Sequence, residues 1–279
     1  MLREIRHQPE HDFRVDSSVI SRIERLPKPA NDLVLDEESP AAEQTTTRVT
    51  ESLTAPESRL TESIGVGQGE APGETYAGLE ELRTTVLACT KCPHLVEFRH
   101  TVVFGVGNPK AELMFVGEAP GAEEDMQGEP FVGRAGELLT RIIQTMGYQR
   151  CDVYIANVLK CRPDMPPGAS GNRQPTPTEM ETCLPYLRQQ IELIRPKVMV
   201  ALGGTAMRGL FGVAEPMKQL RGRWHAFNSI PVMATFHPSY LLRNQALSEK
   251  RKVWEDMLQV LERLERPISE KQRNYFLAR

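Results

Sequence analysis

Four cysteines are the residues with the clearest potential chemistry in this sequence. Cys89 and Cys92 form a Cys-x-x-Cys pair, and Cys161 and Cys183 follow far downstream. A single pair fits a redox-active turn or half a zinc site, but two further cysteines complete a four-thiolate shell suited to zinc or an iron–sulfur cluster. Spacing alone does not distinguish these metals. We expect one metal centre to hold three distant segments together, and we expect Cys151, which matches no ligand position, to be a free thiol.

The elements that must position such a site follow a regular alternation. Four short, nearly continuous apolar segments predict strands that are covered on both faces, at 113–116, 153–156, 198–202 and 232–236. Helical patterns are found at 135–146, 178–194, 205–210 and 248–264, the last with apolar residues at spacings of three and four. This order of elements predicts an α/β fold with a parallel sheet.

Polar residues follow each predicted strand. Glu118 follows the first, Asn157 the second, Gly203-Gly204-Thr205 the third and His237 the fourth. Singly, these residues have ordinary interpretations as a helix-start acid, a turn residue and a loop histidine. Ligands of open α/β sheets bind at the carboxyl ends of the strands. The joint placement of a carboxylate, an amide and an imidazole therefore predicts a functional site at this edge.

Composition sets limits on the class of protein. The chain has 279 residues, with Lys+Arg 34 against Asp+Glu 37 and a net charge of −3, which gives no global nucleic-acid signature. A DNA-binding face would have to be local. No apolar segment reaches 18 residues and the N-terminus has no hydrophobic signal core, so we expect a cytoplasmic protein without membrane contact. In a reducing compartment the five cysteines are expected to be thiols or metal ligands.

The sequence divides into three parts. Residues 1–77 are rich in Glu, Ser, Thr, Pro and Arg and lack a sustained apolar period, so we interpret them as a disordered arm with a short helix near 19–26. Nothing indicates a partner for this arm. Residues 78–266 form the predicted globular domain, expected to be monomeric, and 267–279 form a C-terminal tail.

Residues 79–265 resemble the family 4 uracil-DNA glycosylases, the iron–sulfur type found in many bacteria and archaea. The matching motifs are Gly117-Glu118-Ala119-Pro120-Gly121, Glu124-Asp125, the 128–136 segment, Asn157 to Pro163, Asn172 to Pro177 and His237-Pro238-Ser239-Tyr240. The resemblance implies a three-layer α/β sandwich with a central four-stranded, mostly parallel sheet. It also implies one structural [4Fe–4S] cluster, with Cys89, Cys92, Cys161 and Cys183 as its ligands.

The activity implied by the resemblance is that of a DNA-repair hydrolase. Such an enzyme flips uracil out of DNA and cleaves its N-glycosidic bond, leaving an abasic site for base excision repair. Asn157 would read the base, because its amide can donate to uracil O4 and accept from N3–H. Phe131 would stack on the base, His237 would stabilise negative charge on O2, and Glu118 would line the pocket beside the sugar.

Water activation is less directly indicated. Related glycosylase families have an aspartate two residues after the first motif glycine, but this chain has Ala119 there. The resemblance points instead to Glu124 and Asn172 as the groups that position water. Since the departing base leaves a cationic sugar, an ordinary carboxylate could suffice.

The loop that begins at His237 resembles the family's minor-groove wedge. Leu241 or Leu242 would fill the gap left by the flipped nucleotide, and Ser239 and Arg243 would contact the DNA backbone. Further phosphate contacts are expected from Lys160, Arg162 and Arg173.

Two other kinds of protein remain as alternatives. One is a binding relative that captures uracil or abasic DNA covalently and carries a basic, His-containing insert; the corresponding segment here, 166–173, has no His. The insert 164–171 is nevertheless longer than the usual family loop. The other alternative is a non-catalytic metal-cluster module, which would have no need for Glu118, Asn157 and His237 at adjacent strand ends.

Overall fold

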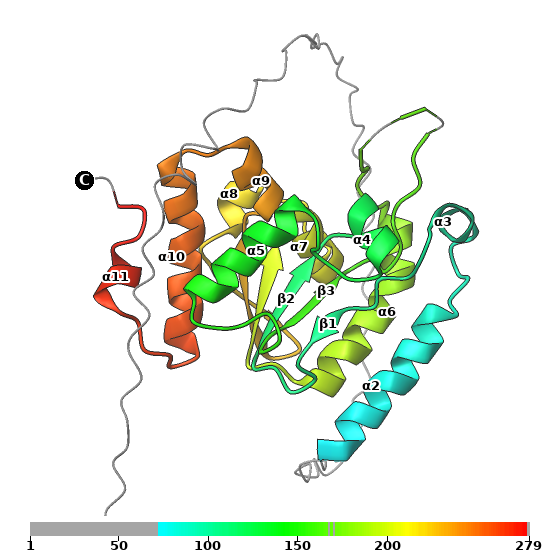
Figure 1. The fold of residues 1–279 in the computed structure, drawn as a ribbon, viewed down its shortest axis with the longest axis horizontal. Helices are drawn as coiled ribbons and strands as arrows, with labels where there is room; N and C mark the ends of the chain where they lie inside the picture. Colours follow the sequence, from blue (N-terminus) through cyan, green and yellow to red (C-terminus); the bar gives the residue numbers. More distant parts are fainter. Residues whose placement is uncertain (1–71, 167, 170, 278–279) are drawn as a thin grey trace, which may run out of the picture. The chain divides into compact units, whose positions relative to one another are not determined.

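The computed structural model describes residues 72–166, 168, 169 and 171–277 (Figure 1). The predicted arm, including the helix expected near 19–26, lies almost entirely outside these residues. Its predicted end at residue 77 is wrong, because helix α2 already begins at Pro72. No helix among the described residues is both long and apolar enough to cross a membrane.

The centre of the domain is a six-stranded sheet with the order β1-β3-β2-β4-β6-β5. The strands are β1 (Val106–Gly107), β2 (Leu113–Gly117), β3 (Tyr154–Asn157), β4 (Val198–Leu202), β5 (Trp224–Phe227) and β6 (Ile230–Thr235). The four central strands are parallel, and the edge strands β1 and β5 pair antiparallel. The predicted four-stranded parallel core is confirmed, and two short edge strands extend it.

Helices cover both faces of this sheet. They are α2 (Pro72–Leu87), α3 (Pro93–Phe98), α4 (Ala122–Gln127), α5 (Arg134–Thr145), α6 (Pro177–Ile194), α7 (Gly204–Phe211), α8 (Met217–Leu220), α9 (Pro238–Arg243), α10 (Leu247–Arg263) and α11 (Glu270–Arg273). One core layer contains buried side chains of α2, α6 and α7, and the other contains those of α5 and α10. Figure 1 shows how these helices are arranged around the sheet. The three-layer α/β sandwich is therefore confirmed.

Neighbouring residues of the central strands point to opposite layers. Met114 and Val116 of β2 face the α2–α6–α7 layer, whereas Leu113 and Phe115 face α5 and α10. All four are completely buried, which explains why the sequence of this strand is continuously apolar rather than alternating.

The C-terminal residues belong to the packed domain and are not a separate tail. The indole N–H of Trp254 on α10 donates to the carbonyl of Gln272, and the ring of Tyr275 packs edge-on against the same indole at 5.5 Å. The predicted boundary at residue 266 is therefore not a boundary of the fold.

Helix α6 begins where its sequence predicts. Thr176 caps it by accepting from the Glu179 N–H at 3.2 Å, while the Glu179 carboxylate accepts from the Thr176 N–H at 2.7 Å. Pro177 occupies the first turn, where its missing N–H costs nothing. This capping fixes the start of the helix that carries Cys183.

The turn between α4 and α5 holds Phe131 in an uncommon conformation. Its φ is +55°, in the left-handed region that non-glycine residues rarely adopt. Arg150 donates to the carbonyl of Pro130, and Gly136 packs against the turn so closely that an added Cβ would lie 1.9 Å from the Phe131 carbonyl oxygen. Only glycine at 136 permits this approach.

We predict that Gly136→Ala lowers the free energy of unfolding by at least about 3 kcal/mol, because the new methyl group overlaps the Phe131 backbone. Gly204→Ala is the matched control: it also adds a methyl group in the first turn of a helix, but the nearest atom lies 3.5 Å away. Urea unfolding should show little change for this control. Equal stabilities of the two variants would contradict the contact.

Candidate active site

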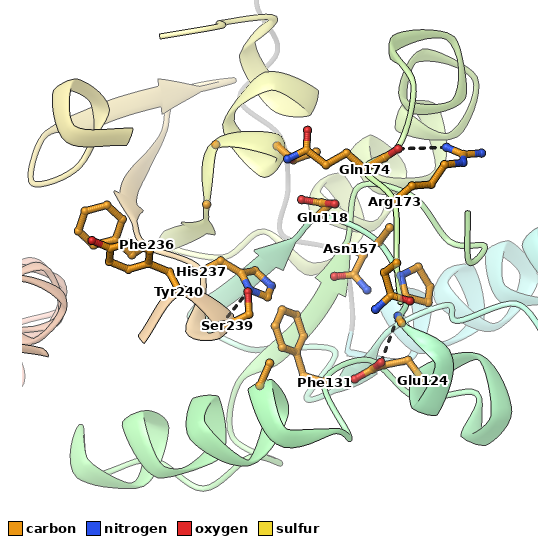
Figure 2. A pocket seen from close by; sticks show the side chains of 18 of the residues that line it. Glu118, Glu124, Phe131, Asn157, Arg173, Gln174, Phe236, His237, Ser239 and Tyr240 are labelled. Atoms are coloured by element: carbon orange, nitrogen blue, oxygen red, sulfur yellow. Dashed lines mark hydrogen bonds between the residues drawn. The ribbon is translucent and has the colours of Figure 1, made fainter. Parts of the chain in front are cut away.

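A pocket of about 750 Å³ lies at the carboxyl ends of the parallel strands (Figure 2). Its lining includes the following side chains named from the sequence: Glu118, Glu124, Phe131, Asn157, Asn172, Arg173, His237, Ser239 and Arg243. The structure thus brings the predicted base-reading, stacking and catalytic residues together. Their individual roles remain predictions.

A narrow slot is formed where β2 and β3 end side by side. Gly117 pairs with Asn157 in the sheet, and a Cβ added to Gly117 would lie 2.4 Å from Asn157 Oδ1 and 2.5 Å from Phe131 Cζ. The Phe131 ring also lies near that of His237, with centroids 5.6 Å apart. A side chain at position 117 would fill this space, so glycine keeps the slot open between the ring and the amide.

Asn157 brings an unused hydrogen-bond acceptor to the slot. The residue is only 2% exposed, and its Oδ1 has no hydrogen-bond partner among the described residues. Burying an unpaired acceptor costs about 1–3 kcal/mol. Such a cost is expected where a ligand supplies the donor.

His237 is held as a neutral hydrogen-bond donor. The backbone N–H of Ser239 donates to its Nδ1 at 3.2 Å, and the Ser239 hydroxyl lies 2.8 Å from the same nitrogen. Because Nδ1 accepts, the ring proton is on Nε2. Burial, assisted by the positive charge of Arg243, lowers the pKa of His237 to about 4, so the ring is neutral at pH 7.

Glu118 also shifts toward its neutral form. Burial raises the pKa of its carboxyl group, and this effect exceeds the opposing effects of a hydrogen bond with Thr205 and of the positive charge of Arg208. Both partners lie on α7, and both line the pocket. Thr205 was predicted only as part of a strand-end turn, and Arg208, which lies one helical turn farther on, was not predicted from the sequence.

Glu124 is committed mainly to the backbone of the Phe131 turn. Its Oε1 accepts from the N–H groups of Val132 and Gly133, both at 3.1 Å, and its Oε2 accepts from Gly121 N–H at 3.1 Å. A carboxylate has about four acceptor positions. Three of these positions are used here, and the fourth is on Oε2. A Cβ added to Gly121 would lie next to this oxygen and 3.1 Å from the amide nitrogen of Asn172, so Asn172 is close to Glu124.

The four predicted ligand cysteines come from three segments that the fold brings into electrostatic contact. Arg99 joins two of these segments, since its guanidinium donates to Cys161 Sγ at 2.9 Å and to the Cys89 carbonyl at 2.8 Å. The backbone N–H of Lys160 donates to Cys183 Sγ at 3.3 Å. Burial raises the pKa of the Cys92, Cys161 and Cys183 thiols, and nearby cysteines raise each of them further.

The described cysteines do not form a group with the spacing of zinc ligands. Within the described part of the chain, no three cysteine sulfur atoms lie within 4.8 Å of one another, whereas a tetrahedral zinc ion with bonds of about 2.3 Å holds its sulfur ligands about 3.8 Å apart. Cys151 is exposed, as expected for a residue outside the ligand set.

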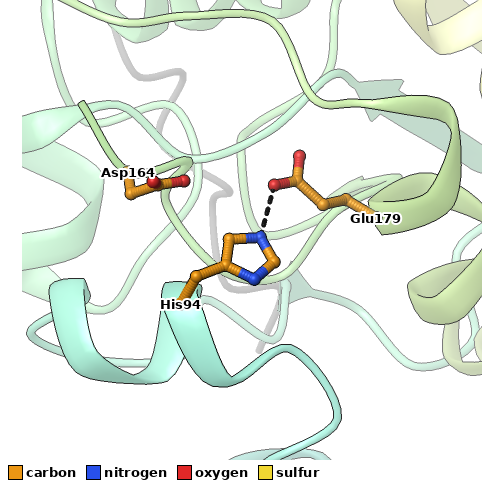
Figure 3. A group of neighbouring side chains, drawn as sticks. All are labelled: His94, Asp164 and Glu179. Carbon is orange, nitrogen blue, oxygen red and sulfur yellow. Dashed lines mark hydrogen bonds and ion pairs between the residues drawn. The ribbon is translucent and has the colours of Figure 1, made fainter. Parts of the chain in front are cut away.

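A second group of possible metal ligands has a simpler interpretation. The ligand atoms of His94, Asp164 and Glu179 lie within 4.8 Å of one another (Figure 3). Arg173, however, donates to both carboxylates. Burial alone would raise the pKa of Glu179, but the hydrogen bonds from Arg173, Thr176 and His94 bring it to about 2. A guanidinium therefore already serves as the cation in this network, and Arg173 is less available for a phosphate than we predicted.

Two of the predicted DNA contacts are wrong. Lys160 is 1% exposed, and its ammonium donates to the Asn157 carbonyl at 2.9 Å and to Gln190 Oε1 at 2.6 Å, so it cannot reach a phosphate. Burial lowers its pKa to about 8. Leu241 is 5% exposed and packs in a core cluster with Phe236 and Val253.

The remaining predicted DNA contacts are accessible. Leu242 is half-buried, Ser239 lines the pocket and Arg243 is exposed beside it. Arg162 is half-buried and covers the ring of Phe98 at 5.5 Å. Of the two wedge candidates, only Leu242 is left.

Comparisons with known proteins agree with this site. A model of the uracil DNA glycosylase superfamily matches residues 104–258. The chain is 46% identical over 184 residues to the type-4 uracil-DNA glycosylase of Thermotoga maritima, covering 64% of this chain and 91% of that protein. It is 42% identical over 180 residues to the type-4 enzyme of Archaeoglobus fulgidus, covering 62% and 87%. A type-5 uracil-DNA glycosylase of Thermus thermophilus is more distant, at 27% identity over 175 residues, covering 50% and 77%.

The low pKa of His237 predicts a pH dependence of stability. The unfolded side chain titrates near 6.5 and the folded one near 4, so the unfolded state binds the proton first as the pH falls. His237 should have no such effect above pH 6.5 and should lower the free energy of unfolding by at most about 3 kcal/mol as the pH falls to 4. Urea unfolding at pH 7 and pH 4.5 should show a smaller loss for His237→Gln than for the wild type. Equal losses would contradict the shift.

Proposed function

Because the chain belongs to the uracil DNA glycosylase superfamily, and within it to the type-4 uracil-DNA glycosylases, we propose that this pocket is where uracil is excised from DNA. The N-glycosidic bond breaks, its electron pair leaves with the base, and a water oxygen bonds to the sugar carbon. The product is an abasic site, which is the starting point of base excision repair. The orphaned Oδ1 of Asn157 in an open slot is the observation that carries this proposal.

Recognition of uracil follows from the slot. A flipped uracil stacked on Phe131 would present its N3–H to Asn157 Oδ1 and its O4 to the Asn157 amide N–H. Cytosine has the opposite donor and acceptor order at this edge. Asn157 would therefore favour uracil, because with cytosine an acceptor would face Oδ1 and a donor would face the amide N–H, which leaves both contacts unpaired.

Departure of the base places negative charge on uracil O2. A neutral His237 with its proton on Nε2 can donate to this oxygen without a change of protonation state. The bond from Ser239 to Nδ1 supports this tautomer. A fixed donor aimed at the developing charge stabilises the transition state in the manner of an oxyanion hole.

Attack by water would take place on the opposite side of the sugar. The free acceptor position of Glu124 next to Asn172 is suited to hold a water molecule and to receive its proton as the new bond forms. Glu118 would lie beside the sugar.

The DNA would be held at the rim of the pocket. We assign the wedge to Leu242 and phosphate contacts to Ser239, Arg243 and Arg162, all of which are at least partly accessible. Arg208 adds a further positive charge to the lining. The negative overall charge of the chain does not prevent DNA binding if these cations act locally.

We also propose that Cys89, Cys92, Cys161 and Cys183 bind one [4Fe–4S] cluster. Four thiols from three neighbouring segments, N–H and guanidinium groups bonded to two of the sulfur atoms, and membership of the type-4 family support this assignment. When bound, the cluster supplies a structural cross-link and keeps the thiols deprotonated. This cross-link would join the segment before α3, the loop after β3, and α6.

Asn157→Asp tests base recognition. The carboxylate would face uracil O4 in a desolvated slot, and a cost of about 3–4 kcal/mol corresponds to a fall of 10²- to 10³-fold in excision. Single-turnover cleavage of uracil-containing and thymine-containing oligonucleotides, followed by alkaline treatment, measures this effect. Asn108→Asp is the control, because the Asn108 side-chain oxygen accepts a bond from Lys110 N–H and an aspartate can do the same. If Asn157→Asp excises uracil at the wild-type rate, Asn157 does not read the base.

Cys161→Ser tests the cluster. We expect protein that lacks brown colour and visible absorption and melts at a much lower temperature, because one ligand of the cross-link is lost. Cys151→Ser removes an exposed thiol outside the ligand set and should keep both properties. Stoichiometric zinc without iron in anaerobically prepared wild type would refute the iron assignment.

A further inference from the structure

We propose that Lys160 is a positioning residue that connects the cluster-bearing helix α6 to the base-reading residue Asn157. The inference rests on the proposed function for the role of Asn157, but the contacts of Lys160 stand independently of it. Lys160 follows β3 and has no route to solvent, since only 1% of the residue is exposed.

The ammonium group bridges two elements. It donates to the main-chain carbonyl of Asn157 at 2.9 Å and to Gln190 Oε1 on α6 at 2.6 Å. Gln190 is itself completely buried, and its amide donates to the Phe104 carbonyl at 3.0 Å and lies 3.2 Å from the Tyr154 hydroxyl. Because both ends of the Gln190 amide are used, its carbonyl oxygen is fixed in the direction of Lys160.

These contacts complete the support of Asn157. On one side, the sheet holds its backbone, because Asn157 pairs with Gly117 and the next N–H, of Val158, donates to the Gly117 carbonyl at 3.0 Å. On the other side, the Lys160 ammonium donates to the Asn157 carbonyl. The position of the Asn157 side chain in the slot therefore depends on the distance between β3 and α6.

Helix α6 carries both the support and a cluster ligand. Cys183 and Gln190 lie seven residues apart on the same helix, about two turns. The backbone N–H of Lys160 donates to Cys183 Sγ at 3.3 Å, while its side chain donates toward Gln190. Lys160 thus contacts α6 at both points, and a shift of α6 would be transmitted to Asn157.

Hydrogen bonding gives a reason for lysine at this position. Its ammonium donates to two neutral oxygens, and no carboxylate within the described residues forms an ion pair with it. A buried donor group is stable only where its hydrogen bonds are made.

Lys160→Met, which keeps an unbranched side chain one atom shorter and removes the donors, tests this connection. In folded, iron-replete protein we expect the inhibition constant of free uracil to rise about tenfold and the single-turnover rate to fall by a similar factor, because Asn157 is no longer aligned. The affinity for uracil-free DNA should change less than twofold. Hydrogen exchange at residues 154–158 should become faster.

Leu187→Ala is the matched control. Leu187 is a completely buried residue of α6, one turn before Gln190, and belongs to the same core layer as Cys183. Its truncation should lower the melting temperature but leave the uracil inhibition constant within about twofold of wild type, since it contacts neither Asn157 nor Lys160 through a hydrogen bond. If the uracil inhibition constant rises equally in both variants, the effect comes from a general loss of stability, and this result would overturn the proposal.

Two further measurements keep the proposal testable if Lys160→Met does not fold. Gln190→Leu removes the anchor on α6 and should raise the uracil inhibition constant in the same direction. In wild-type protein labelled with ¹⁵N-lysine, one ammonium signal should be protected from solvent exchange. An unprotected ammonium, or an unchanged inhibition constant in folded variants, would overturn the proposal. A wild type that does not excise uracil would refute the proposed function, whereas the exchange measurements would still test Lys160.

Discussion

The site depends on one close approach, that of Phe131 and Asn157 across the missing side chain of Gly117. A methyl group at position 117 would lie within 2.5 Å of atoms of both residues, so the slot exists only because the last residue of β2 has no side chain. Everything around the slot maintains this approach. Gly136 and Arg150 hold the Phe131 turn, Glu124 binds the same turn through backbone N–H groups, and the sheet fixes Asn157.

Burial has opposite chemical consequences for the two titratable groups that face this slot. It lowers the pKa of His237 and raises that of Glu118, so both are shifted toward neutral forms. A neutral imidazole beside the departing base suits a reaction that itself separates charge, with an anionic base leaving a cationic sugar. In surroundings of low polarity, a single well-placed hydrogen bond has a larger effect than it would in water.

The sequence predicted the parts of this protein whose patterns are local. The central strands are buried on both faces and therefore continuously apolar, and the polar residues after them converge because parallel strands end at one edge. The edge strands were missed because β1 has two residues and β5 is a short strand of mixed burial. Lys160 was placed on the surface because its acceptors, Asn157 and Gln190, become its neighbours only after β3 packs on α6. Leu241 and Leu242 are adjacent in sequence, and only the helix geometry of α9 decides which one faces the core.

The left-handed backbone of Phe131 has a consequence for how the slot selects its ligand. The ring is placed during folding, in a conformation that costs of order 1 kcal/mol and is held from several sides, so no loop needs to be ordered when a base arrives. A preorganised surface of this kind offers the same stacking face to every flat heterocycle. Discrimination between bases must then come from the polar edge of the base. A substitution at Phe131 should therefore change the affinity for all bases more than the selectivity between them.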